Sequence, residues 1–330
     1  MKWKVLAGLR FFLAWIVVSD HTRFFIPGAD GNPLFIFSKL NAMAAVLGFL
    51  LISGYSIAHS LIKQPKEFYQ RRVLRIYPLY FFAVLVSLIP FWILGDTIQV
   101  PRQEFVQPTI WTAFGNFLLL QGFAVRTIQI NPVLWTLSIE VLCYLLAPVF
   151  IKLSSKVLIL LIGLSASFYL AFPFIYNALF PTTRLPFYTS LQYGIAFCLL
   201  LWAWLLGFLY ARQNEATALK IALIGLGCLL LLLNQNHTGK AGIFTYGLSS
   251  GVLIFASQIK LPSFLLNSLN YLGNISYPLY LFHVPTLIFC YAGLGIKTPE
   301  TLAFIAILVA MLFYHAVDIP LRSRRVVLPA

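Results

Sequence analysis

Acidic residues are scarce in this chain, which has 9 Asp and Glu against 23 Lys and Arg in 330 residues, with charged residues at 10% of the total. Soluble domains carry about 25% charged residues, so this composition excludes an ordinary soluble domain. The net charge of +14 could indicate a nucleic-acid partner. The basic residues, however, lie in short loops between apolar runs, as the positive-inside rule of membrane proteins predicts. We therefore expect the lipid bilayer, and no nucleic acid, among the partners.

Cysteine, internal repeats and long polar stretches are also missing or rare. The four cysteines lie inside apolar runs without CxxC spacing, at Cys143, Cys198, Cys228 and Cys290. Such residues are typical of packing, and they predict neither disulfides nor a metal site. No period of 20–50 residues repeats, which excludes a solenoid. The tail from Pro320 to Ala330 is too short to bury a core, so we expect one integral-membrane domain over residues 1–330.

Apolar runs of 16 to 24 residues recur along the whole chain, and each is long enough to cross a hydrocarbon core of about 30 Å. The stretch 111–123 is shorter and contains Gly115, Asn116 and Gln121, which is typical of a re-entrant or interfacial segment. If this stretch does not cross, ten spans remain, at residues 4–26, 40–62, 77–94, 133–152, 156–176, 188–210, 219–234, 241–258, 271–293 and 300–318.

Counting the basic residues distinguishes ten crossings from eleven. With ten spans, the 22 Lys and Arg other than Arg10 divide into 15 inside and 7 outside, whereas a crossing at 111–123 divides them 11 and 11. The positive-inside rule favours the uneven division. No signal cleavage is expected, because Val18 is followed by Ser-Asp-His instead of small residues. The sequence therefore predicts an all-α polytopic membrane protein with about ten transmembrane helices, integral to the cell (inner) membrane, with both termini in the cytoplasm.

The first span carries two groups that are costly in lipid, Arg10 and His21. Eleven positions separate them, and at about 100° per residue this brings both onto one face of a helix. Ionisable residues within a membrane are functional candidates by default. The structural alternative is that Arg10 reaches the inner headgroups and His21 marks the outer interface. Asp20 lies about 100° round the helix from His21 and does not share its face.

Glu140 is one of three acidic residues in or at the ends of spans, together with Asp20 and Asp318. It lies near the outer end of a span that runs inward, at a depth similar to that of His21. General base catalysis can use an imidazole that takes a hydroxyl proton and a carboxylate that orients it. The sequence predicts Glu140 and His21 in one polar cavity. The alternative is that Glu140 hydrogen-bonds neighbouring helices as structural support.

Three arginines stand at the cytoplasmic mouth of the third span, at Arg71, Arg72 and Arg75. On a helix, positions i and i+4 share a face, so these side chains extend in two neighbouring directions. Arginine suits bidentate binding of phosphate. Basic residues at this place can also anchor the loop and contact anionic lipid. Both interpretations remain open.

A third group of polar residues lies in the run 272–283. Ser276, Tyr277 and Tyr280 fall on neighbouring helix faces, and His283 lies one turn beyond Tyr280, near mid-membrane. A buried histidine can equally serve as a hydrogen-bonded strut between helices.

In order along the chain, these motifs resemble those of the integral-membrane acyltransferase-3 family over nearly the full length. The segments that carry the resemblance are Gly8-Leu9-Arg10 with His21, and the runs 49–55, 71–78, 134–140 and 275–283. The resemblance implies a ten-helix enzyme that transfers an acyl group from cytoplasmic acyl-CoA to a hydroxyl of a surface or exported carbohydrate, with Arg10 and His21 essential. The chain departs from the family pattern after Glu140, where an apolar Val141-Leu142-Cys143 stands.

The residues and the resemblance together suggest one mechanism. Acetyl-CoA, or another acyl-CoA, docks with its phosphates on Arg71, Arg72 and Arg75. The pantetheine arm reaches into the bundle past or near Arg10. His21, with help from Glu140, deprotonates the acceptor hydroxyl, or His21 forms a covalent acyl intermediate. The catalytic candidates are thus His21, Glu140 and Arg10.

Further polar groups could bind the substrate or the oxyanion, and the candidates are Trp135, Ser138, Tyr277 and His283. The rival hypothesis is a transporter or flippase of a lipid-linked sugar, which would also need charged groups in the membrane. Such proteins often contain an internal repeat, and none is found here. The acceptor and the oligomeric state stay open.

Overall fold

The computed structural model describes residues 1–323. The rest of the predicted tail, residues 324–330, and the side chains of Arg322 and Ser323 lie outside the described residues. Helices make up most of the described chain: α1 Lys2–Phe25, α2 Ala42–Lys63, α3 Phe68–Leu94, α4 Ile110–Phe117, α5 Leu134–Phe150, α6 Ser155–Leu179, α7 Ile195–Arg212, α8 Thr217–Leu233, α9 Gly239–Phe255, α10 Ser263–Ala292, α11 Pro299–Phe313 and α12 Ile319–Ser323.

Short elements connect these helices. Two are 3-10 helices, η1 at Pro33–Leu40 and η2 at Tyr188–Ser190, and a π-helical segment, η3, covers Tyr314–Asp318. An antiparallel hairpin of β1 Thr97–Val100 and β2 Gln103–Val106 follows α3, with Thr97 opposite Val106.

The predicted all-α membrane class is confirmed, and each of the ten predicted spans coincides with a helix. Within residues 1–323, seven helices are long and apolar enough to cross a membrane: α1, α2, α3, α6, α7, α10, and α11 with its continuation to Leu321. Two shorter apolar helices are α5 and α8, and α9 has 17 residues. The helix α4 has 8 residues, about 12 Å at 1.5 Å per residue, so it is too short to cross. The stretch 111–123 is thus a short helix followed by a turn.

The largest difference from the predicted boundaries is at α3, which begins at Phe68 and not near Tyr77. Phe68 is buried, and the Arg72 guanidinium lies over its ring at 5.5 Å from the ring centre. This packing extends the helix through the basic stretch, so the three arginines lie on α3 itself. In contrast, α7 begins at Ile195, later than predicted, because the chain before it forms a loop containing η2.

Small residues allow the central helices to approach closely. A Cβ added to Gly54 on α2 would lie 1.9 Å from the Trp204 carbonyl oxygen on α7, and one added to Gly207 would lie 2.0 Å from the Leu51 carbonyl. Backbones in contact at glycine are a recurring way to pack membrane helices. The pair α2 and α7 therefore forms a rigid centre for the bundle.

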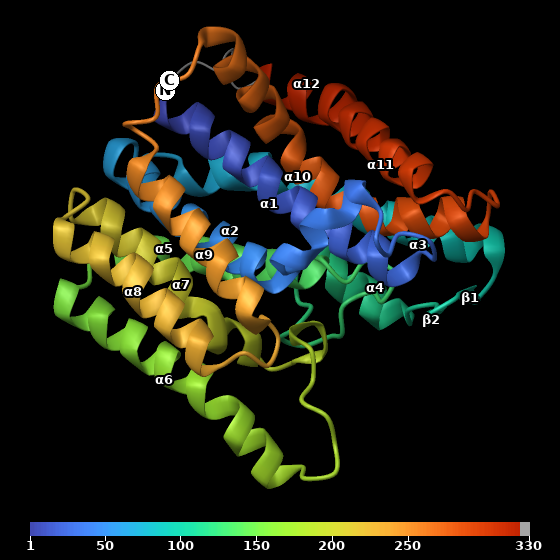
Figure 1. Cartoon of the computed structure of the whole chain (residues 1–330), viewed down its shortest axis with the longest axis horizontal. Helices are drawn as coiled ribbons and strands as arrows, with labels where there is room; N and C mark the ends of the chain where they lie inside the picture. The colour runs from blue at the N-terminus through green and yellow to red at the C-terminus, as the bar shows by residue number, and fades with distance from the viewer. Residues whose placement is uncertain (324–330) are drawn as a thin grey trace.

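Figure 1 shows α10 alongside α1, while α6 lies at one edge of the bundle against α7. A Cβ added to Gly273 on α10 would lie 2.3 Å from the Cβ of Ala7 on α1. Further along both helices, His21 contacts His283. The residue numbers of these two contacts increase along both helices, so α1 and α10 run parallel. Their close packing brings the two histidines together.

Candidate functional site

A cavity of about 1070 Å³ opens at the end of the bundle where α1 ends and α2 begins. Its walls come from these two helices, the start of α5, the chain around residues 126–133 and the loop 186–193 that contains η2. Ligand sites commonly occupy about 300–1000 Å³, so the cavity can hold a substrate of several rings. His21 lines it, together with Trp135 and Tyr280.

His21 is hydrogen-bonded to a second histidine. Its Nδ1 lies 2.9 Å from Nε2 of His283, whose side chain is fully buried. On its other side, Nδ1 of His283 lies 2.9 Å from the Tyr280 carbonyl oxygen and 3.1 Å from that of Leu279. A carbonyl oxygen only accepts, so Nδ1 of His283 carries the proton.

This assignment propagates to His21. In the neutral ring of His283, the proton on Nδ1 leaves Nε2 as an acceptor, so Nδ1 of His21 donates to it. The Nε2 of a neutral His21 then has a free lone pair. The hydrogen bonds thus select the tautomer of His21 that can accept a proton at Nε2.

A proline and an asparagine help to position His283 in α10. Pro285 has no N–H, so the carbonyl of Leu281, four residues earlier, loses its helical donor. The Nδ2 of Asn131 donates to that carbonyl at 3.0 Å and to Ser87 Oγ of α3 at 2.9 Å. The buried Asn131 side chain therefore ties the chain before α5 to the two helices, next to the histidine pair.

Glu140 has different partners from those predicted. Its carboxylate accepts hydrogen bonds from Ser53 Oγ on α2, at 2.7 Å, and from the Tyr144 hydroxyl one turn along α5. On the next turn of α2, Ser56 Oγ accepts from Arg10 at 2.8 Å. Arg10 is also near enough to Glu140 for electrostatic interaction. The serines of α2 therefore place Glu140 beside Arg10.

The prediction that Glu140 and His21 line one polar cavity does not match this cavity, because Glu140 is hydrogen-bonded to Ser53 and Tyr144 and does not line it. Glu140 is six residues from the start of α5 at Leu134, about 9 Å along the helix. His21 is four residues from the end of α1 at Phe25 and bonds to His283. The start of α5 and the end of α1 both border the cavity, and His21 lines it, whereas Glu140 is not among its lining residues.

The three arginines of α3 play different parts. Arg71 donates to the backbone carbonyls of Gln64 and Lys66. It therefore anchors the loop before α3, which was the alternative to phosphate binding. Arg72 donates to Ser60 Oγ of α2 at 2.6 Å, while its Nε is buried without a partner among residues 1–323. Arg75 is exposed. Arg72 and Arg75 are both close enough to Arg10 to interact electrostatically, so these three form a positive cluster, and Glu140 is a charged neighbour of Arg10 and of Arg72.

The remaining predicted residues are spread over both regions. Trp135 lines the cavity and stacks on Tyr188 with ring centres 5.7 Å apart. Ser138 Oγ donates to the Trp135 carbonyl at 2.8 Å. The Tyr277 hydroxyl donates to the Ile76 carbonyl of α3 at 3.1 Å. The hydroxyl protons of Ser138 and Tyr277 are thus used by the backbone.

Several cavity residues were not predicted as site residues. His237, from the loop between α8 and α9, packs against Tyr188 at 5.2 Å and Phe187 at 5.3 Å between ring centres. Burial lowers the pKa of this imidazole, which favours its neutral form. Asp20 also lines the cavity, although it lies off the helix face of His21. The signal in the sequence that could have identified Asp20 was its position as one of three acidic residues in or at the ends of spans.

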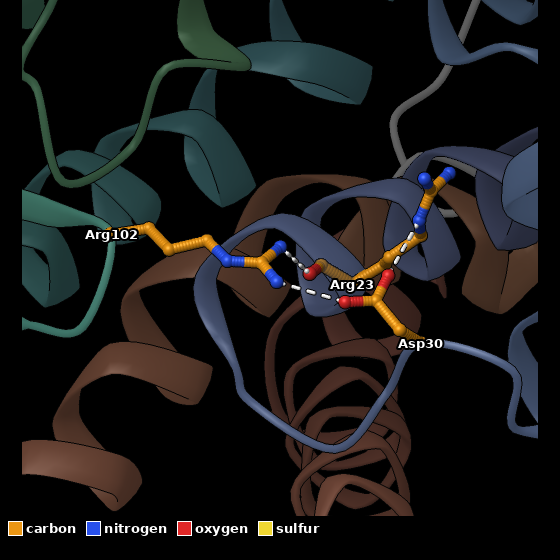
Figure 2. Close-up of polar contacts among 3 residues, drawn as sticks. All are labelled: Arg23, Asp30 and Arg102. Atoms are coloured by element: carbon orange, nitrogen blue, oxygen red, sulfur yellow. Dashed lines mark hydrogen bonds and ion pairs between the residues drawn. The ribbon is translucent and has the colours of Figure 1, made fainter.

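A charged network ties the β-hairpin to the end of α1 beside the cavity. Figure 2 shows the Asp30 carboxylate between two guanidinium groups: Arg23 Nε lies 2.9 Å from Oδ1 and Arg102 Nη2 lies 2.8 Å from Oδ2. Arg102 Nη1 also donates to the Arg23 carbonyl at 3.0 Å. These hydrogen bonds, first that from Arg102, lower the pKa of Asp30. The hairpin, whose Gln103 lines the cavity, is thereby held over the end of α1.

The fold and this site define a polytopic helical membrane protein with a large cavity at one end of the bundle and a hydrogen-bonded histidine pair beside it. The chain belongs to the acyltransferase domain family, which it matches over residues 4–314. It is therefore a membrane-embedded acyltransferase that transfers groups other than aminoacyl groups.

Two relatives agree with this assignment. A protein of Acidianus two-tailed virus, named as a provisional acetyltransferase, is 24% identical over 337 residues, covering 97% of this chain and 88% of the relative. An O-acetyl transferase of Shigella phage Sf6 is 30% identical over 146 residues, covering 42% of this chain and 43% of the relative. No solved structure matches the chain.

Proposed function

We propose that this protein is an O-acetyltransferase that takes an acetyl group from acetyl-CoA, or another acyl group from its acyl-CoA, and transfers it to a hydroxyl of a surface or exported carbohydrate. His21 is the general base. The observation that carries this proposal is the hydrogen bond between His21 Nδ1 and His283 Nε2. It leaves the other nitrogen of His21 free to accept a proton, in a side chain that lines a large cavity.

The reaction needs one proton acceptor and one leaving group. His21 Nε2 takes the proton of the acceptor hydroxyl while its oxygen attacks the thioester carbonyl. The carbon–sulfur bond then breaks, the coenzyme A thiolate leaves, and the proton on His21 returns to that sulfur. The imidazolium formed in between is stabilised by its hydrogen bond to His283, which also holds the ring in its orientation.

The donor is expected to bind on the side of the positive cluster. Arg10 and Arg72 both interact electrostatically with Glu140, and Arg75 interacts with Arg10 and Arg72, so three guanidinium groups lie near this carboxylate. Such an excess of guanidinium groups suits the phosphates of acyl-CoA. The buried Nε of Arg72 has no partner among the described residues, which supports a bound anion there. Glu140 would then hold Arg10 in place and would not touch the reacting hydroxyl.

The acceptor is expected to bind in the cavity, from the opposite end of the bundle. With the N-terminus in the cytoplasm, as the positive-inside rule predicts, the arginines face the cytoplasm and the cavity faces outward from the inner membrane. Donor and acceptor then approach from opposite sides and meet near His21. This arrangement suits acylation of a carbohydrate that has left the cytoplasm.

The test uses the purified protein in lipid nanodiscs with radiolabelled acetyl-CoA and a glycan acceptor. We expect transfer of label to the acceptor and release of one thiol per ester formed. His21→Ala should lower both by at least about a hundredfold, because general base catalysis contributes about 10²–10⁴-fold. His315→Gln is the matched control, since His315 is exposed and contacts Tyr271 away from the cavity.

Two results would contradict the proposal. One is a wild-type protein that moves a lipid-linked sugar across the bilayer without forming an ester, which would favour the transporter. The other is His21→Ala with wild-type transfer, which would remove the general base. Label trapped on His21 after acid quenching would replace the direct transfer by a covalent intermediate.

A further inference from the structure

The cavity contains a carboxylate that the proposed mechanism does not use. Asp20 precedes His21 on α1, and both side chains line the cavity. No residue between 1 and 323 hydrogen-bonds or forms an ion pair with the Asp20 carboxylate. Its charged neighbour is Arg23, one turn along the helix, and the Nε of Arg23 is committed to Asp30. An ionised carboxylate only accepts hydrogen bonds, so Asp20 needs donors that the described chain does not supply.

Asp20 cannot serve as the hydrogen-bond partner of His21. Neighbouring residues on a helix point about 100° apart, and the Nδ1 of His21 is already occupied by His283. The carboxylate therefore faces a different part of the cavity from the one that holds the histidine pair. Its free oxygens are available to a molecule in the cavity.

Another part of the cavity wall is aromatic. Trp135 and Tyr188 stack nearly parallel, at 14° between ring planes, and His237 and Phe187 continue this wall. Ring faces of this kind pack against the C–H face of a sugar, whose hydroxyls point outward round the ring. A few polar groups in an otherwise apolar and aromatic pocket fix the orientation of a ligand. Hydroxyls are the donors that a carboxylate lacks here.

We propose that Asp20 recognises the acceptor, by accepting hydrogen bonds from sugar hydroxyls beside the one that is acylated, and that it restricts the reacting ring to a neutral sugar. This inference rests on the proposed function. A sugar with its own carboxylate or phosphate on that ring would place two like charges together out of bulk water, which selects against it.

The other charged residue of the lining is of opposite sign and lies elsewhere. Arg126 is exposed, and it is not among the electrostatic neighbours of Asp20. It therefore lies on a part of the cavity wall apart from Asp20. The opposite charges of Asp20 and Arg126 provide a test. Removing the charge of Asp20 should weaken the preference for a neutral acceptor, and removing that of Arg126 should strengthen it.

The experiment measures kcat and KM for two oligosaccharide acceptors in nanodiscs with saturating acetyl-CoA. One acceptor ends in a neutral hexose, and the other ends in the corresponding uronic acid. We expect the wild type to prefer the neutral acceptor by at least tenfold in kcat/KM. Asp20→Asn should reduce this preference by at least tenfold, mainly by raising KM for the neutral acceptor.

Three further variants complete the design. Asp20→Glu keeps the charge and should keep most of the preference, which tests charge apart from shape. Arg126→Gln should increase the preference for the neutral acceptor. Asp96→Asn is the matched control, because Asp96 is an exposed carboxylate before the hairpin, and it should leave both acceptors unchanged.

An unchanged preference in Asp20→Asn overturns the inference, and so does a wild type that prefers the uronic acid. Equal loss with both acceptors in Asp20→Asn and Asp20→Glu also overturns it, because Asp20 would then support His21 or the fold. Failure of the proposed function is separate: the wild type would then acylate neither acceptor and release no thiol.

Discussion

His283 should act as a positioning residue for His21, and its removal tests the tautomer argument. In His283→Ala, the Nδ1–H of His21 loses its acceptor and the other tautomer becomes accessible, in which Nε2 carries the proton and cannot act as a base. The imidazolium formed during the reaction also loses a hydrogen bond. A hydrogen bond to a charged group contributes about 1.5–3 kcal/mol, and each 1.36 kcal/mol is tenfold in rate. We therefore expect kcat to fall by about 10-fold to about 150-fold.

The conservative variant separates positioning from packing. In His283→Gln, the amide oxygen can reach the place of the imidazole Nε2 and accept from His21 Nδ1. This variant should recover kcat to within about tenfold of the wild type, because the acceptor function is restored. The KM for the acyl-CoA should stay unchanged in both variants, since His283 lies away from the arginine cluster.

The assay is steady-state thiol release with a glycan acceptor, paired with the melting temperature of each variant in nanodiscs. A wild-type kcat in His283→Ala would refute the positioning role of His283. That role would equally be refuted by a His283→Gln variant that melts like the wild type and is as slow as His283→Ala, because an acceptor at that place would then have no effect.

Other substitutions separate binding from structure. Arg72→Ala should raise the KM for acyl-CoA by at least tenfold. Arg71→Ala removes hydrogen bonds to loop carbonyls, so it should lower the melting temperature and leave that KM unchanged. Equal effects of the two variants on KM would contradict the assignment of Arg72 to donor binding and of Arg71 to the loop. Asp30→Asn should lower the melting temperature at pH 7 and do so less at pH 3. The Arg102 and Arg23 hydrogen bonds lower the pKa of Asp30 in the folded protein, so its stabilisation is present above the unfolded pKa of about 3.9 and disappears as the pH falls through the folded value. A pH-independent difference in melting temperature would exclude this carboxylate as the cause.

Helix positions were predictable because each depends on a local signal. An apolar run of membrane length predicts a span wherever it occurs, and the 13 residues of 111–123 were too short and too polar for one. The helix boundaries differ from the predicted ones where packing, and not local composition, decides where a helix begins. At Phe68, burial of one ring continued α3 through the basic stretch, whereas before Ile195 the chain turned into a cavity wall.

The site was predictable only in part, for a geometric reason. Helical periodicity specifies the direction of a side chain within one helix, and it correctly separated Asp20 from the face of His21. It does not specify how wide a cavity is, and this cavity is wide enough for both Asp20 and His21 to line it. Periodicity also does not specify which side chains of different helices meet, and Glu140 is hydrogen-bonded to Ser53 and Tyr144 and interacts electrostatically with Arg10.

The pairing of His21 with His283 shows what additional information is needed. Both residues were candidates, but their contact depends on α1 and α10 running parallel and in close contact. That contact is made at Gly273, where the space for a side chain is taken by Ala7. A larger residue at this position would separate the helices some 10 residues before the histidines meet. The chemistry of the site therefore depends on a glycine outside it, whose effect appears only when the two helices are placed together.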